Sequence, residues 1–117
     1  MDKKLISLIK QIRQKDIPCY LATNQEIHRT NYMRSTMRFD QIFDDAFSSA
    51  ELRTKKPKPE FYSKTASKLA ISEVSNVWLI EDTQSNIDAA INFGFSGIMY
   101  QDFDRFNQFV RKQKWLA

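Results

Sequence analysis

The chain has 117 residues, of which 42% are hydrophobic and 27% charged, and its formal net charge is +4. This predicts one small globular domain over residues 1–117, and a single cysteine excludes a disulfide framework or a clustered-thiol zinc site. The sequence contains no run of about 18 apolar residues, so it predicts no membrane helix. It also shows no apolar signal region near Met1, so we expect a cytoplasmic protein without a membrane partner. The basic residues are spread along the chain, which does not indicate a nucleic-acid partner.

Hydrophobic periodicity predicts helices that alternate with short apolar strands. In chain order we expect a helix over about 2–15, a strand over 19–22, a weak helix over 25–37, a strand near 46–48, a helix from about 59, a strand over 77–80, a helix ending at Gly94, a strand over 97–100 and a final helix from about 103. In the helix before Gly94, Ile87, Ala90 and Ile91 are expected to face inward. This alternation predicts an α/β fold, a Rossmann-like parallel sheet covered by helices on both faces.

Polar residues follow two of the predicted strands, where ligands bind in parallel sheets. Thr23 and Asn24 end one strand, Glu81 and Asp82 end another, and Lys56 lies in the loop before a helix. The hydroxyl and nearby N–H groups can donate to phosphate oxygens, and the lysine can offset the phosphoryl charge. Carboxylates are the usual protein ligands of Mg²⁺. These residue types favour a site for phosphate and magnesium.

Three segments together resemble the haloacid dehalogenase (HAD) superfamily. The strand and its polar end at 21–24 resemble the second motif of the family, and 56–62, with the sequence KPKPEFY, resembles the third. The acidic pair and following residues at 79–90 resemble the fourth. The stretch 31–52 resembles subfamily IA, which includes small sugar-phosphate and nucleotide phosphatases. The resemblance runs from about residue 5 to 100, so we expect a HAD-like core.

The resemblance implies Mg²⁺-dependent hydrolysis of a small phosphorylated metabolite through an aspartyl-phosphate. Thr23 would bind a phosphate oxygen, Asn24 would assist through its backbone N–H, and Lys56 would stabilise the nucleophile and the phosphoryl group. Asp82 would bind Mg²⁺ directly, and Glu81 would lie at the metal or one contact away from it. Asn86 would orient the acidic loop.

The sequence departs from the family at the first motif. Members carry D-x-D-x-[TV] after the first, central strand, where the first aspartate is the nucleophile and the second the acid–base group. The only D-x-D triplet here is Asp102–Asp104, which follows the last predicted strand. We therefore expect a core domain that lacks the central first strand, the cap domain and the nucleophile.

Loss of that strand would leave the strands at 19–23 and 77–81 with unpaired edges. The chain could be part of a longer protein, it could form a homodimer through those edges, or the two strands could pair directly. In function, a phosphohydrolase with a nucleophile supplied by other residues stands beside an inactive remnant or interaction module. A phosphorelay receiver domain has similar residues in a different order, and a nucleic-acid binder rests on the sequence pI of about 9.3 alone.

Overall fold

The computed structural model describes residues 2–36 and 39–117 of the chain. Its elements are α1 (Lys3–Gln14), β1 (Tyr20–Thr23), α2 (Ile27–Thr36), a 3₁₀ turn η1 (Phe39–Gln41), β2 (Asp45–Ser48), α3 (Ser49–Leu52), α4 (Pro59–Leu69), a 3₁₀ turn η2 (Val74–Asn76), β3 (Trp78–Glu81), α5 (Gln84–Phe93), β4 (Ser96–Met99) and α6 (Phe103–Lys112). Each predicted helix and strand is present. The weak helix was expected to reach Met37, which lies outside the described residues. The short helix α3 was not predicted.

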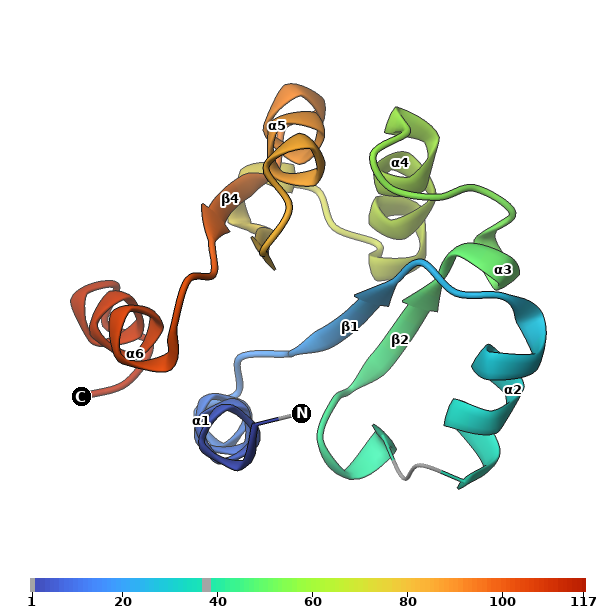
Figure 1. Ribbon diagram of the computed structural model, residues 1–117. Helices are drawn as coiled ribbons and strands as arrows, with labels where there is room; N and C mark the ends of the chain where they lie inside the picture. The colour runs from blue at the N-terminus through green and yellow to red at the C-terminus, as the bar shows by residue number, and fades with distance from the viewer. Residues whose placement is uncertain (1, 37–38) are drawn as a thin grey trace.

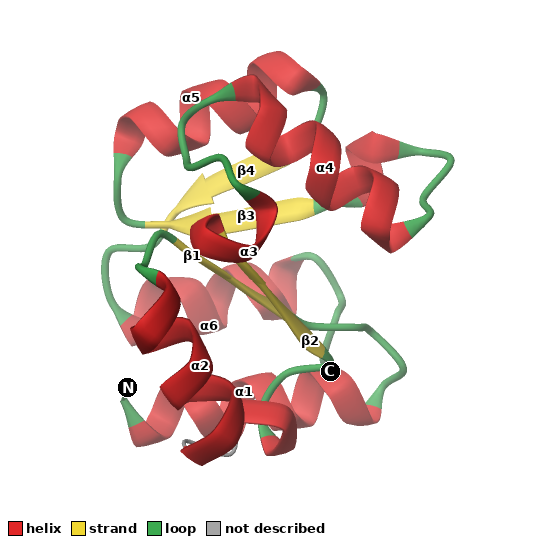
Figure 2. Ribbon diagram, turned by 90° about the vertical axis from the view of Figure 1, so that its right-hand side faces the viewer, coloured by secondary structure: helices red, strands yellow, loops and turns green. Residues whose placement is uncertain are grey.

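The helices cover the strands on two sides. Figure 2 shows α4 and α5 on one side of the strands and α1 and α6 on the other, which gives the three layers of an α/β/α fold. Helices α2 and α3 lie at the end of the molecule beside β2 (Figure 1). The predicted α/β architecture with parallel strands is confirmed.

The strands do not form one continuous sheet. β1 pairs with β2 and β3 pairs with β4, both in parallel, and these two-stranded sheets are separate among the described residues. The missing first strand predicts two unpaired strand edges, and the alternative in which the two inner strands pair directly is wrong. Apolar side chains from the two helix layers line a cavity of about 830 Å³ between β1 and β3.

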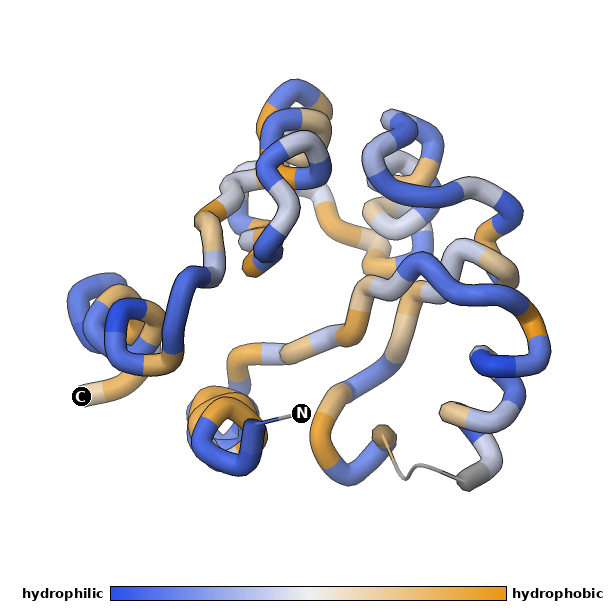
Figure 3. The backbone as a smooth tube through the Cα atoms, viewed as in Figure 1, coloured by the Kyte–Doolittle hydropathy of each residue, from blue (hydrophilic) through white to orange (hydrophobic). Residues whose placement is uncertain are grey.

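Each helix layer has its own buried core. On one side, Phe61 and Tyr62 of α4 pack with Ala90 of α5. On the other, Leu8 and Ile12 of α1 pack with residues of α6 such as Phe106 and Val110. Figure 3 shows hydrophobic residues along β1 and β2 and a mixture of hydrophobic and hydrophilic residues along the helices. The strands thus lie between two apolar layers, as their near-continuous hydrophobic sequences predict.

Two local features fix α4 and α5. Pro59 occupies the first turn of α4, where its missing N–H leaves no bond unmade. Gly94 ends α5 with φ of 124°, a conformation that other residues rarely adopt.

The prediction that Ile91 faces inward is wrong, because this residue is 50% exposed. It lies near Gly97 of β4, which has no side chain to cover it.

Candidate functional site

The ammonium group of Lys56 joins the ends of the two separate sheets. Its Nζ donates to the backbone oxygen of Ala22 in β1 at 3.0 Å and to Glu81 Oε1 at the end of β3 at 2.8 Å. Both charged side chains are about nine-tenths buried, with 9% and 10% of their surface exposed. A primary ammonium has three N–H donors, so one donor remains beyond these two bonds. Lys56 therefore lies where the polar ends of β1 and β3 meet.

The carboxylate of Glu81 is held by three donors. Besides Lys56, the amide of Asn86 donates to Oε1 at 3.0 Å and the backbone N–H of Asp82 donates to Oε2 at 2.8 Å. Burial raises the pKa of Glu81, but the hydrogen bonds from Lys56 and Asn86 outweigh it and lower this pKa to about 2. The Tyr62 hydroxyl donates to the backbone oxygen of Asn86 at 2.9 Å, which ties α4 to the first turn of α5. Glu81 is therefore a charged anchor with both oxygens engaged.

The loop that carries Lys56 is tied to the end of β1 through Asn24. Asn24 Nδ2 donates to the Lys56 backbone oxygen at 3.1 Å, and the Lys56 backbone N–H donates to Asn24 Oδ1 at 3.0 Å. Thr23, one residue earlier, is half-buried, and its hydroxyl has no hydrogen-bond partner among the described residues. Thr23 therefore presents a free donor beside the Lys56 loop.

Asp82 has the most accessible carboxylate of the acidic pair. It is exposed, and its only side-chain contact in the described structure is from Thr83 Oγ1 to Oδ1 at 3.3 Å. Mg²⁺ commonly takes one or two carboxylates and completes its shell with water and phosphate oxygens. The Asp82 carboxylate could supply one ligand of such a shell, whereas the Glu81 carboxylate is already paired with Lys56. Across residues 2–36 and 39–117, no group of three or more His, Cys, Asp or Glu side chains is placed to hold a metal ion.

The structure brings the residues that the sequence predicts for the site close together. Thr23, Asn24 and Lys56 lie at the end of β1, and Glu81, Asp82 and Asn86 lie at the end of β3. Sequence reasoning missed the Ala22 carbonyl and Tyr62. A backbone oxygen leaves no sequence signal, and Tyr62 also acts through a backbone oxygen, that of Asn86.

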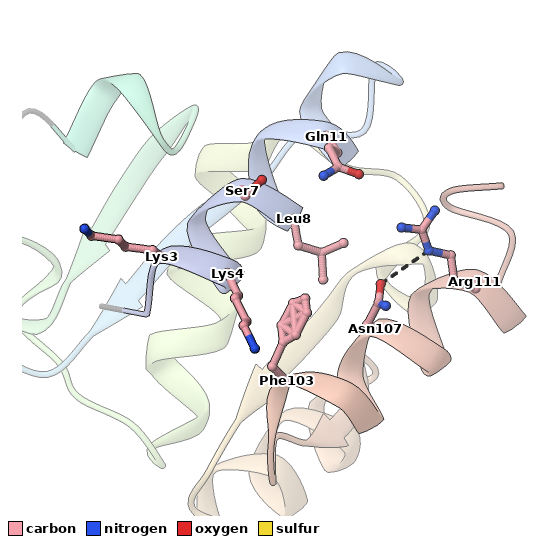
Figure 4. Close-up of a pocket in the computed structure, with 8 residues that line it drawn as sticks. All are labelled: Lys3, Lys4, Ser7, Leu8, Gln11, Phe103, Asn107 and Arg111. Atoms are coloured by element: carbon pink, nitrogen blue, oxygen red, sulfur yellow. Dashed lines mark hydrogen bonds between the residues drawn. The ribbon is translucent and has the colours of Figure 1, made fainter.

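A second, smaller cavity lies elsewhere, between α1 and α6. Its volume is about 360 Å³, and Figure 4 shows Leu8 of α1 facing Phe103 of α6, with Lys4 nearby. Along α6, Arg111 Nε donates to Asn107 Oδ1 at 3.3 Å. None of the residues predicted for the phosphate and metal site lines this cavity. The strand ends thus remain the candidate functional site.

Comparison with known proteins identifies the family of the chain. Residues 2–94 match the haloacid dehalogenase-like hydrolase family. A sesquiterpene phosphatase of Aspergillus oryzae is 25% identical over 101 residues, which are 86% of this chain and 51% of that protein. The chain thus spans about half the length of this curated relative.

Solved structures share the fold. A HAD-superfamily hydrolase of Ehrlichia chaffeensis superposes with a TM-score of 0.78 at 21% identity, over 95% of this chain and 58% of that one. A HAD-family enzyme of Bacteroides thetaiotaomicron, solved with magnesium and inorganic phosphate, gives 0.77 at 18% identity, over 91% and 58%. No helix among the described residues is long and apolar enough to cross a membrane. With a family match that covers most of its length and the expected strand-end residues in place, the chain belongs to the haloacid dehalogenase-like hydrolases.

Proposed function

We propose that residues 1–117 form one incomplete HAD-like core domain, without a cap domain, that takes part in Mg²⁺-dependent hydrolysis of a small phosphorylated metabolite. The observation that carries the proposal is the placement of Lys56. Its buried ammonium lies between β1 and Glu81, with one N–H donor remaining beyond those two bonds. A fixed positive charge in a partly dehydrated site acts strongly on a phosphoryl group and needs no rearrangement during the reaction.

The residues would divide the work by chemistry. The hydroxyl of Thr23 and the backbone N–H of Asn24 would donate to phosphate oxygens, and the third N–H of Lys56 would face the transferring group. Asp82 would hold Mg²⁺, which when bound offsets the charge of the phosphate oxygens. Glu81 would hold the side chain of Lys56 in place, and Asn86 would orient Glu81. Phosphoryl transfer depends mainly on such positioning and charge, apart from the nucleophile.

The nucleophile would be a carboxylate from residues outside the described strands. It would attack phosphorus, displace the alcohol and form an aspartyl-phosphate, which water then cleaves to release inorganic phosphate. Sequencing the gene upstream of the codon for Met1 tests whether the nucleophile lies there. An in-frame apolar strand followed by D-x-D-x-[TV] would support the proposal, and a stop codon or frameshift there would favour the alternative below.

Binding of inorganic phosphate to the 117-residue chain tests the site without turnover. Broadening of the ³¹P resonance is expected to increase when Mg²⁺ is added, and Asp82→Asn is expected to abolish this Mg²⁺ effect. Asp88→Asn is the matched control, because Asp88 is also an exposed carboxylate, on α5, and among the described residues its side chain bonds only Gln84. Equal Mg²⁺ effects in both variants would contradict the assignment of Asp82. Any phosphatase activity that survives Asp82→Asn would point to a contaminant or another mechanism.

The second candidate function is an inactive remnant that acts as an interaction module. It is favoured by one feature of the sequence, the absence of a D-x-D triplet at the end of any strand before Asp102. Under this alternative the chain would bind phosphate at most weakly, and its preparations would release no phosphate from p-nitrophenyl phosphate. Mg²⁺-dependent release that is lost in Asp82→Asn would exclude it.

A further inference from the structure

The cavity of about 360 Å³ between α1 and α6, which we call the helix pocket, is bordered by positive charge. Lys3 and Lys4 of α1 and Arg111 of α6 are exposed and line it. The other lining residues are Ser7, Leu8, Gln11, Phe103 and Asn107. Among the described residues, no aspartate or glutamate lines the helix pocket. Three cations around one cavity attract anions, so the helix pocket favours a negatively charged ligand.

The two lysines of the helix pocket have no anionic partner in the described part of the chain. The Asp2 carboxylate accepts from the backbone N–H of Lys4 at 2.9 Å and caps α1, but neither ammonium group is paired with it. Lys3 and Lys4 lie in the first turn of α1, which contains no acidic residue. Cations are unfavourable there, because the positive end of the helix dipole repels them. An anion bound between α1 and α6 would offset this repulsion.

The guanidinium group of Arg111 is held in one orientation. Its Nε donates to Asn107 Oδ1 at 3.3 Å, and its Nη1 donates to the backbone oxygen of Ala117 at 2.5 Å. A guanidinium has five N–H donors, and these two bonds leave the remaining donors available. Its planar fork matches the paired oxygens of a carboxylate or a phosphate. Because Arg111 is already oriented, an anion that binds to it immobilises little additional side-chain motion.

The helix pocket also offers one aromatic ring. Leu8 is buried and faces Phe103 (Figure 4), and Phe103 packs against the core between α1 and α6, so the position of its ring is fixed. This ring is half-buried. Unlike Phe106 and Phe109 of the same helix, Phe103 contacts no other aromatic ring among the described residues. A fixed and partly exposed ring without a ring partner can pack against a flat apolar group of a ligand.

We infer that the helix pocket binds a small aromatic anion, a flat ring that carries a carboxylate or a phosphate. Arg111 would bind the anionic oxygens, Lys3 and Lys4 would add to the attraction, and Phe103 would contact the ring. The volume of about 360 Å³ lies at the lower end of the usual range for small-molecule pockets, about 300–1,000 Å³, so it suits a molecule of one or two rings. This inference is independent of the proposed function, because none of the strand-end residues lines the helix pocket.

An NMR titration of the full 117-residue chain with 2-naphthoate tests the inference. The side-chain amide resonances of Gln11 and Asn107, which line the helix pocket, are expected to shift and to saturate. The side-chain amides of Asn24 and Asn86 at the strand ends are internal controls and should not shift. Neutral 2-naphthamide has the same ring without the charge. It should bind about tenfold more weakly or less tightly still, because it forms no charge-assisted hydrogen bond with Arg111. Adenosine monophosphate tests a phosphate on a ring in the same way, and the tighter of the two anions identifies the preferred head group.

Three variants separate the contributions of charge and ring. Arg111→Gln should weaken 2-naphthoate binding by about tenfold, whereas Lys112→Gln, at the next and equally exposed position of α6, should change it by less than about twofold. Because Arg111 also bonds Ala117, Lys4→Gln is a second charge variant that removes no side-chain hydrogen bond of the described structure. It should weaken binding by about two- to fivefold. Phe103→Leu should weaken binding by about two- to tenfold, because it keeps an apolar side chain but removes the ring.

Each other result would overturn the inference. Equal binding of 2-naphthoate and 2-naphthamide would mean that charge plays no part. Equal losses in Arg111→Gln and Lys112→Gln would show only a general attraction of anions to a basic surface. Shifts confined to Asn24 and Asn86 would place the anion at the strand ends, and no shift with either anion at millimolar concentration would mean that the helix pocket takes no such ligand. Absence of Mg²⁺-dependent phosphate binding at the strand ends would overturn the proposed function alone.

Discussion

Asn24 and Lys56 are joined by two reciprocal hydrogen bonds, although 32 residues separate them in the sequence. The side-chain amide of Asn24 acts as donor and acceptor to the Lys56 backbone, much as a neighbouring strand would. This contact fixes where the lysine loop leaves the end of β1. The Lys56 side chain then reaches back to the Ala22 oxygen and across to Glu81. Asn24 therefore positions Lys56 through the main chain.

Asn24→Ala should release this loop. Loss of two hydrogen bonds at an exposed position is expected to lower the free energy of unfolding by about 1–2 kcal/mol. Inorganic phosphate should also bind more weakly, because Lys56 is no longer fixed. The control is Asn107→Ala, which removes one amide bond to Arg111 on α6, away from the site. Urea unfolding and ³¹P titrations measure both effects. If Asn107→Ala weakens phosphate binding equally, the positioning role of Asn24 is wrong.

Lys56→Met should destabilise the protein strongly. It leaves the buried carboxylate of Glu81 without its cation, which typically costs about 3–5 kcal/mol. Lys58→Met, at an exposed position two residues later, should change stability by about 0.5 kcal/mol or less. Chemical unfolding of both variants checks this difference.

A double variant keeps that test informative if Lys56→Met does not fold. Lys56→Met with Glu81→Leu removes both charges and should recover most of the lost stability, because an apolar pair needs no compensation. A double variant as unstable as the sum of its single changes would show that the two side chains act independently.

The sequence was sufficient to predict the order of elements and the residues that meet at the strand ends. Apolar runs, Pro59 and Gly94 carry that information locally, and the polar ends of parallel strands must meet at one edge of the fold. The side-chain contact between Lys56 and the Ala22 oxygen could not be predicted, because it depends on the path of the loop. The missing first motif predicts unpaired edges on two strands, but it does not determine whether these strands pair directly. That outcome depends on packing between the helix layers, which the pattern within each strand does not specify.

The error at Ile91 has a similar cause. Its spacing from Ile87 and Ala90 places it near the apolar side of α5, and helical periodicity cannot tell where the covered surface ends. It lies at the outer edge of the two-stranded sheet, over Gly97, and half of its surface is exposed. Burial at a sheet edge depends on how many strands the sheet has, which helical spacing alone does not indicate.

Two residues with positive φ at helix ends should respond to substitution in opposite directions. Ala70 ends α4 with φ of 53°, so Ala70→Gly should stabilise the protein by about 0.5–1 kcal/mol by removing the left-handed penalty of a side chain. Gly94→Ala should destabilise it by at least about 1 kcal/mol. Its φ is 124°, and an added Cβ would lie 2.9 Å from Val74 Cγ2. Thermal unfolding of both variants is the measurement, and equal signs would contradict the backbone assignment.

The stability that Glu81 contributes should depend on pH in a defined range. Its pKa is lowered from 4.5 to about 2 in the folded chain, chiefly by the bonds from Lys56 and Asn86 that outweigh burial. A depressed carboxyl pKa means that the unfolded chain binds the proton more tightly. The contribution is therefore full above pH 4.5 and is lost as the pH falls toward about 2.

Glu81→Gln isolates this contribution from the other carboxyl groups. The difference in unfolding free energy between the natural chain and this variant should be constant above pH 4.5 and shrink steadily below it. Asp88→Asn, an exposed carboxylate on α5, supplies the matched control. Urea unfolding of all three proteins over a pH series gives the two difference curves. The difference between the natural chain and Glu81→Gln could instead stay constant below pH 4.5. The pKa of Glu81 would then be ordinary in the folded chain, and the ion pair with Lys56 would not lower it.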